Sequence, residues 1–265
     1  MLGFLLGLIL VEVIYIFLER FGETWWIWAA CFWLFLSFVL AKITPNVIIP
    51  LFYKYQTLNN PSLRNRIFKL FDSCRVSLKD VYAIDMSTKT KKANAFLCGL
   101  VTSRRVVLSD TLLNEFSDDE VEVVVAHELG HLKHSDILKM LFIQAVVIFV
   151  GLFLVAQLLK KALIVFQLKG IDDIAFLPGI LFVFMIFSFI LQPVLNGYSR
   201  VMERAADRYS LEKTGNAQAF VTLMFKLGEM NLSEFLPSRA IEIFLYDHPP
   251  IQKRVDAARE FLRKQ

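Results

Sequence analysis

Four long apolar stretches alternate with more polar parts along this chain. They cover residues 2–18, 25–41, 137–159 and 174–195. At the helical rise of about 1.5 Å per residue, the last two are long enough to cross a bilayer core of about 30 Å, and the first two fall just short. Trp25, Trp26 and Trp28 cluster where the interfacial aromatic belt of a membrane helix would lie. The pattern therefore favours four transmembrane helices over the alternative of a buried hairpin in a globular domain.

The apolar stretches divide the chain into four parts. Residues 1–41 would form an N-terminal transmembrane hairpin and residues 137–195 a second one, while residues 42–136 and 196–265 would form one polar domain. Both polar parts then lie on one side of the membrane, and they hold most of the Lys and Arg residues. By the positive-inside rule this side is cytoplasmic. The N-terminal stretch lacks the basic region and cleavage site of a signal peptide, so we expect it to be a membrane span.

Composition agrees with a membrane protein and excludes several other classes. Hydrophobic residues make up 56% of the 265 positions, and 25 residues are Phe, which is more apolar surface than a core of this size can bury. The net charge of +4 is modest, and no run of Lys and Arg is typical of a nucleic-acid-binding protein. The three cysteines, Cys31, Cys74 and Cys98, form no C-x-x-C pair, which argues against a disulfide framework and a thiolate zinc site.

The polar parts show the patterns of short strands and amphipathic helices. Residues 62–74 place their apolar side chains on one helical face. Strands are expected at residues 81–86, 93–100 and 104–110, and further helices at residues 198–213, 216–229 and 250–263. Ser117 and Glu120 form a capping box, so another helix begins near residue 118. The chain is therefore predicted to be a mainly α protein with a small β-sheet.

The helix that begins near residue 118 carries the most specific chemical signal, the sequence HELGH at residues 127–131. His127 and His131 are four residues apart, so they share a helical face and could bind one Zn²⁺. Glu128 is placed to contact a water rather than the metal, as in the His-Glu-x-x-His arrangement of zinc peptidases. There zinc polarises the scissile carbonyl, and the Glu is the general base. An accidental match on a buried amphipathic helix is the alternative.

Two other residues of this segment have simpler interpretations. Gly130 would allow a neighbouring backbone to approach closely, at a cost of about 1 kcal/mol relative to Ala in a helix. His134 is out of register with the two candidate ligands. We expect it to cap the helix or to face solvent.

A catalytic zinc site usually has three protein ligands, and the sequence NGYSRVMERAAD at residues 196–207 offers the third. Glu203 and Asp207 are four residues apart on a predicted helix, and two membrane crossings return this helix to the side that carries HELGH. We expect Glu203 to bind the metal and Asp207 to accept a hydrogen bond from a ligand imidazole, most plausibly His127. A solvated, salt-bridged helix face is the alternative. The expected cofactor is one Zn²⁺ per chain.

The motifs together resemble those of a known family of membrane-embedded zinc peptidases. HELGH, two apolar spans and N-x-x-S-R-x-x-E-x-x-A-D at residues 196–207 are similar to the CAAX prenyl protease type 1 family and its HtpX-like bacterial relatives. NAF at residues 94–96 and DHPP at residues 247–250 extend the resemblance over most of residues 80–260. It implies a zincin fold of the gluzincin type, an α+β catalytic domain in which His127, His131 and Glu203 bind zinc and Glu128 is the general base.

The same motifs suggest roles for four further residues. Asn94 and Ala95 would lie on an edge strand that pairs with extended substrate. His248 would stabilise the oxyanion or anchor substrate, although from the sequence alone His-Pro-Pro could simply start a helix. Arg200 would bind a carboxylate near the site or substrate carbonyls, or else lie on the surface.

These observations predict a multi-pass integral membrane protein with a zinc endopeptidase site on the cytoplasmic side of a bacterial or archaeal inner membrane, or of the endoplasmic reticulum membrane. Expected partners are the lipid bilayer and a peptide or protein substrate: membrane, misfolded or lipidated proteins. The prenyl proteases have more spans than the four expected here, which leaves prenylated substrates open. The alternative is a non-enzymatic scaffold or translocation-associated protein with a structural zinc. Glu128 favours catalysis, and so does the lack of a fourth good ligand candidate, because structural zinc usually has four protein ligands.

Overall fold

The computed structural model describes residues 2–99, 103–166, 173 and 177–264. The described chain is mainly helical, with one small sheet. It divides into two compact units, each built from two separate parts of the sequence. The first unit comprises residues 1–42 and 138–192, and the second comprises residues 43–137 and 193–265.

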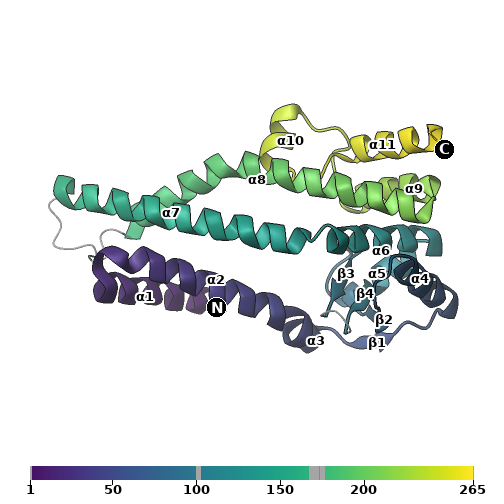
Figure 1. The fold of residues 1–265 in the computed structure, drawn as a ribbon, viewed down its shortest axis with the longest axis horizontal. Coiled ribbons are helices and arrows are strands. Elements are labelled where there is room, and N and C mark those ends of the chain that lie inside the picture. The colour runs from purple at the N-terminus through teal and green to yellow at the C-terminus, as the bar shows by residue number, and fades with distance from the viewer. Residues whose placement is uncertain (1, 100–102, 167–172, 174–176, 265) are drawn as a thin grey trace. The chain divides into compact units, whose positions relative to one another are not determined.

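The first unit is helical (Figure 1). Helices α1 (Leu2–Phe21) and α2 (Trp25–Ile43) are joined by a 3₁₀ turn at Gly22–Thr24 and lie side by side. The unit also contains most of α7 (Asp136–Phe166) and the first part of α8 (Leu177–Thr214). Their shared core consists of Leu18, Trp25, Ala29, Ala30, Leu152, Val155, Ala156, Leu159 and Ile180.

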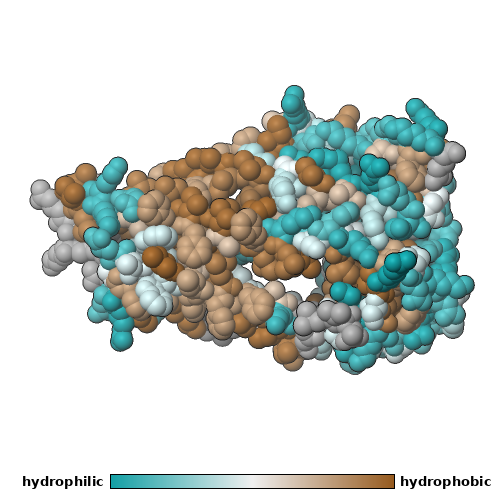
Figure 2. All heavy atoms as spheres, viewed as in Figure 1, coloured by the Kyte–Doolittle hydropathy of each residue, from teal (hydrophilic) through white to brown (hydrophobic). Residues whose placement is uncertain are grey.

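The outer surfaces of these helices are also apolar, as membrane helices require. Phe142 and Phe189 have 71% and 65% of their surface exposed, and Figure 2 shows hydrophobic residues gathered over α7 and the start of α8. Three stretches of the described chain are long and apolar enough to cross a membrane: Gly7–Ile43, Asp136–Val165 and Leu177–Thr214. The prediction of membrane helices is therefore confirmed.

The number of spans depends on the first of these stretches. It contains both α1 and α2, and the rings of Phe17 and Phe32 meet edge to face across the two helices, with centroids 5.8 Å apart. The chain thus folds back within the stretch. Helix α7 continues past the predicted end at residue 159, as far as Phe166. The rest of the predicted connector, residues 167–172, lies outside the described part of the chain.

The second unit contains a four-stranded sheet in the order β1–β2–β4–β3. The strands are β1 (Tyr55–Thr57), β2 (Asp80–Ile84), β3 (Ala95–Cys98) and β4 (Arg105–Ser109). β2 and β4 are parallel and the other two pairs antiparallel. The three predicted strands are confirmed, with ends that differ by one or two residues from the predicted ones, whereas β1 was missed because three residues are too few to show an alternating pattern. β3 is an edge strand, and no described strand pairs with its other side.

Helices form most of the rest of the second unit (Figure 1). They are α3 (Ile49–Phe52), α4 (Pro61–Ser73), α5 (Asp110–Glu115), α6 (Asp118–Lys133), α9 (Ala217–Met230), α10 (Arg239–Leu245), α11 (Ile251–Arg263) and the second part of α8. A π-helical turn at Thr44–Ile48 precedes α3, and a 3₁₀ turn lies at Met86–Thr88. Fully buried side chains include Ile67, Phe71, Val81, Leu108, Leu129 and Phe220.

Two helices of this unit carry the candidate ligands. α6 begins as predicted, because Ser117 and Glu120 form both hydrogen bonds of a capping box. The helix predicted at residues 198–213 is not separate, since α8 continues without a break from the fourth apolar stretch. α6 and α8 approach closely at Gly130, where an added Cβ would lie 3.0 Å from the Cα of Ala206. This confirms the expectation that Gly130 allows a neighbouring backbone to come near.

Candidate metal centre

Three side chains from two helices of the second unit converge on one point. His127 and His131 come from α6 and Glu203 from α8. The Nε2 atoms of the two histidines are 3.1 Å apart. Oε2 of Glu203 lies 3.3 Å from the Nε2 of His127, and Oε1 lies 3.3 Å from the Nε2 of His131. The three predicted ligands are therefore brought together.

These distances fit a single cation. At bond lengths of 2.0–2.1 Å and tetrahedral angles, the ligand atoms of one ion lie about 3.3 Å from each other. Two imidazole nitrogens that face each other at this range also need a cation or a proton between them. In addition, Oε2 of Glu203 is buried and accepts no hydrogen bond from the described residues. A buried acceptor without a donor is costly, and a metal ion would satisfy it.

Each histidine has a second carboxylate on its other ring nitrogen. Oδ1 of Asp207 lies 2.9 Å from Nδ1 of His127, as the sequence predicts for these two residues. Oδ2 of Asp136 lies 2.9 Å from Nδ1 of His131. Such partners fix which ring nitrogen carries the proton, and they leave the Nε2 lone pair free for a metal.

Two charged residues next to the ligands were missed by the sequence analysis. Asp136 is the first residue of α7 and only 4% exposed. Arg254 on α11 forms a two-point ion pair with Asp207, with Nε–Oδ2 and Nη2–Oδ1 distances of 2.8 and 2.5 Å. A sequence signal exists for Arg254, because it lies next to Val255 and four residues before Ala258, and an Arg beside the apolar positions of a helix needs a charged partner. The corresponding signal for Asp136 is an acidic residue at the start of an apolar span.

The charges around the site perturb its titratable groups. Burial by itself would lower the pKa of His127, but the carboxylates of Asp207 and Glu203 outweigh it and raise the pKa to about 9. The pKa of His131 is raised in the same way, with burial opposed by Glu203 and Asp136. Burial raises the pKa of Glu128. A cation held by these residues would compete with the protons on the two imidazoles.

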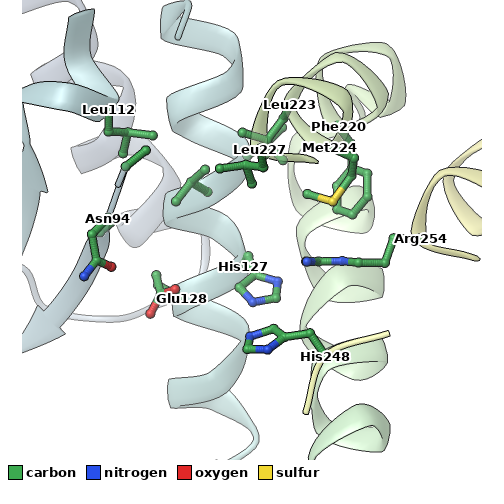
Figure 3. A pocket seen from close by; sticks show the side chains of 14 residues that line it. Asn94, Leu112, His127, Glu128, Phe220, Leu223, Met224, Leu227, His248 and Arg254 are labelled. Atoms are coloured by element: carbon green, nitrogen blue, oxygen red, sulfur yellow. The ribbon is translucent and has the colours of Figure 1, made fainter. Parts of the chain in front are cut away.

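A cavity of about 220 Å³ opens beside the ligands. Figure 3 shows Glu128 between Asn94 and His127, with His248 facing the same space. Arg254 also lines the cavity. The end of the cavity away from the ligands is apolar. The apolar lining includes Leu112, Phe220, Leu223, Met224 and Leu227. The arrangement places one partly buried carboxylate, an imidazole and an edge strand around a space large enough for part of a peptide.

The edge strand presents the main chain of Ala95 to its unpaired side. The N–H of Asn94 donates to Oγ of Ser109, and the carbonyl of Asn94 accepts from the N–H of Ser109. The main chain of Asn94 therefore faces β4. Because these directions alternate along an antiparallel strand, the N–H and C=O of Ala95 point away from β4. Asn94 and Ala95 both line the cavity.

His248 reaches the ligands from the segment between α10 and α11. Its Nε2 lies 3.4 Å from Oε1 of Glu203, and its Nδ1 lies 2.9 Å from Oδ1 of Asp247. The ring is half exposed, so it remains accessible to a bound molecule.

The structure also places the two remaining residues. Arg200 is buried, and its Nη1 donates to the carbonyls of Glu242 and Tyr246, at 2.8 and 2.5 Å. It thereby holds the segment that leads to His248. His134 is the C-cap residue of α6, as one of the two expectations had it, and its ring lies edge-on to the ring of Tyr209.

Two protein-family models match the chain. Residues 57–262 match peptidase family M48, and residues 1–54 match the CAAX prenyl protease N-terminal domain, which is described as five membrane helices. The first match includes all the ligands and the cavity-lining residues.

Relatives and a solved structure agree with these matches. The uncharacterized metalloprotease YhfN of Bacillus subtilis is 32% identical over 252 residues, which cover 94% of this chain and 59% of that protein. A CAAX prenyl protease 1 homolog of Arabidopsis thaliana is 31% identical, with 97% of this chain and 61% of that protein covered. The crystal structure of S. mikatae Ste24p superposes with a TM-score of 0.82 at 25% identity, over 97% of this chain and 64% of that one. The chain thus spans about three fifths of the length of these curated relatives.

Proposed function

The chain belongs to peptidase family M48, and on this premise we propose that it is a membrane-embedded zinc endopeptidase that cleaves membrane, misfolded or lipidated proteins. The observation that carries the proposal is the convergence of His127, His131 and Glu203 beside Glu128, in a cavity bordered by an edge strand. A scaffold with a structural zinc would have no need for this carboxylate or this cavity.

Zinc is the proposed metal because of its ligands. Two imidazole nitrogens and one carboxylate oxygen are a ligand set of catalytic zinc sites, which keep a fourth position open. When bound, zinc would supply a Lewis acid that polarises a peptide carbonyl and acidifies water. Asp207 and Asp136 would hold the two imidazoles in the tautomer that leaves Nε2 unprotonated.

Glu128 is the proposed general base. Its carboxylate would accept a proton from the attacking water and pass that proton to the nitrogen of the leaving amine. A raised pKa suits both steps, because the group must take up a proton and release it again near neutral pH.

The proposed substrate is an extended peptide that pairs with β3. The N–H and C=O of Ala95 are directed to the unpaired side of the strand, where they would form main-chain hydrogen bonds to the substrate peptide. Asn94 would contact the same peptide from the cavity wall. The apolar end of the cavity, which includes Leu223 and Leu227, would accept an apolar side chain of the substrate.

His248 and Arg200 have different proposed roles. His248 would donate from Nε2 to the oxygen of the peptide bond under attack, since it is accessible and lies beside Glu203. The sequence left three roles open for Arg200: binding a carboxylate near the site, binding substrate carbonyls, or lying on the surface. Because Nη1 of Arg200 already donates to two carbonyls of its own chain, we propose that it acts by holding the segment before His248.

The proposed topology has four spans, α1, α2, α7 and α8, with the metal centre in a gluzincin-type domain on the cytoplasmic side. The chain's folding back between α1 and α2 supports counting them separately. The excess of Lys and Arg in the second unit supports the cytoplasmic side.

The test compares the wild type with Glu128→Gln in detergent, with Glu229→Gln, an exposed carboxylate of α9, as a matched control. Bound zinc is measured by elemental analysis, and cleavage is measured with casein and a panel of prenylated and unprenylated peptides. We expect one zinc per chain in all three proteins and cleavage in all but Glu128→Gln. Full activity of Glu128→Gln would show that Glu128 is not the general base. Zinc without cleavage of any substrate in the wild type would favour the scaffold.

A further inference from the structure

A surface of the second unit combines exposed apolar and basic side chains where the first candidate span ends. That span ends at Ile43, the first residue of the unit. Three apolar residues at four-residue spacing begin there: Ile43, Val47 and Leu51, which are 38%, 58% and 76% exposed. The next residue, Phe52, is 58% exposed. Residues at this spacing share one face of a helical segment. An apolar stripe therefore continues from the span into the polar unit.

Four exposed lysines accompany the stripe. They are Lys54, Lys89, Lys91 and Lys92. Lys89 joins the two segments, because its Nζ donates to the carbonyl of Phe52 at 2.9 Å and lies over the rings of Phe52 and Tyr53. Lys91 and Lys92 follow within three residues, so they lie near the same place.

The nearby carboxylates do not neutralise these lysines. Oδ1 of Asp85 accepts from the main-chain N–H of Lys54. Asp110 accepts from the N–H and hydroxyl of Ser87. Among the described residues, no carboxylate forms an ion pair with the ammonium group of Lys54, Lys91 or Lys92, so the positive charge is available to a partner.

We propose that this surface binds the anionic headgroups of membrane lipids. It is called the basic stripe here and comprises Ile43, Val47, Leu51, Phe52, Lys54, Lys89, Lys91 and Lys92. Two features specify a bilayer as the partner. The apolar residues begin where the span ends, and lysines immediately beyond a membrane helix are the arrangement that attracts anionic lipid. An aromatic ring beside a lysine is typical of the headgroup level, where the lysine stem stays in apolar surroundings.

The basic stripe is connected to the cavity by the chain itself. Ala93, Asn94 and Ala95 follow Lys92 directly and line the cavity. The carbonyl of Lys92 is also fixed, because it accepts a hydrogen bond from Oγ1 of Thr111 at 2.8 Å. Lipid bound at Lys91 and Lys92 would thus hold the strand that borders the cavity at the bilayer surface. This consequence rests on the proposed function, whereas lipid binding itself does not.

The test uses the full chain in nanodiscs and needs no catalysis, so every protein also carries Glu128→Gln. Discs of phosphatidylcholine alone are compared with discs that contain one-third phosphatidylglycerol. The readout is amide hydrogen exchange in peptides that cover residues 43–54 and 86–93. The variant is Lys54→Gln/Lys91→Gln/Lys92→Gln, which leaves Lys89 and its contacts unchanged. The matched control changes three exposed lysines elsewhere in the unit, Lys69, Lys79 and Lys213, to Gln.

We expect phosphatidylglycerol to slow exchange in these peptides by roughly threefold or more in the unchanged lysine background and in the control, and to have little effect in the variant. The slowing should disappear in about 1 M salt, where charges are screened within about 3 Å. Equal exchange in both kinds of disc, or undiminished slowing in the variant, would overturn the proposal. Equal slowing by soluble polyglutamate in phosphatidylcholine discs would assign the surface to acidic polypeptides instead. None of these outcomes depends on whether the chain is a peptidase.

Discussion

Oδ2 of Asp136 lies 2.9 Å from Nδ1 of His131, and this contact joins the metal centre to the first residue of α7. Asp207 holds His127 at the same distance. Both candidate imidazole ligands are therefore backed by a buried carboxylate, one from the start of a membrane helix and one from the end of another.

Asp136→Asn should weaken metal binding by about 10–100-fold, because the neutral amide no longer raises the basicity of the His131 ring. Affinity is measured by competition with a chromogenic chelator. Asp72→Asn, an exposed change at the end of α4, is the control and should leave the affinity unchanged. Equal affinities in both variants would show that Asp136 does not position His131.

Gly130→Ala should weaken metal binding even though Ala is the better helix former by about 1 kcal/mol. The new Cβ would meet the Cα of Ala206 at 3.0 Å and its carbonyl oxygen at 3.3 Å, and backbone atoms of a helix cannot easily move aside. α6 and α8, which carry the ligands, would be pushed apart.

The matched control for this change is Gly197→Ala on α8, where the new Cβ would have an ordinary contact at 3.7 Å from Nη2 of Arg200. It should raise the thermal midpoint slightly and leave the affinity for zinc unchanged. The prediction fails if Gly130→Ala binds zinc as tightly as Gly197→Ala does.

Arg254→Met should destabilise the second unit by about 3–5 kcal/mol, since it leaves the buried carboxylate of Asp207 without its cation. The double variant Arg254→Met/Asp207→Leu should recover much of this loss, because no unpaired charge remains. It should still bind metal weakly, as His127 has lost its partner. Thermal midpoints in detergent and chelator competition separate the two effects. A double variant no more stable than the single one would argue against this account.

Glu120→Gln should reduce stability by about 1 kcal/mol at neutral pH. Burial alone would raise the pKa of Glu120, but hydrogen bonds from Lys226 and Ser117 lower it below its usual value of 4.5. A carboxylate with a lowered folded-state pKa stabilises the protein above its unfolded pKa, and this contribution is lost as the pH falls through the folded-state value. The difference in stability between the variant and the wild type should therefore shrink below about pH 4.5.

Midpoints measured across this pH range check the prediction about Glu120. Glu229→Gln, at an exposed position of α9, should show no comparable difference. If the difference in thermal midpoint between Glu120→Gln and the wild type stays constant down to acid pH, the charge of Glu120 is not what stabilises α6.

The sequence determined those features that depend on neighbours along the chain. Helical spacing placed His127 and His131 on one face, the capping box set the start of α6, and uninterrupted apolar length predicted the membrane helices. Glu203 was found because its own helix carries a recognisable pattern. Short elements such as β1 and α10 gave no signal, since a few residues show no periodicity.

Only the tertiary structure decided which distant residues meet. Arg254 pairs with Asp207, and Arg200 pairs with the carbonyls before His248, across more than 40 residues of sequence in each case, and no local pattern specifies such contacts. The same holds for the free side of β3, because strand order makes β3 an edge and its register with β4 decides that Ala95 rather than Asn94 turns its main chain outward. Local spacing is fixed by backbone geometry, whereas contacts between segments follow from burial and charge compensation over the whole fold.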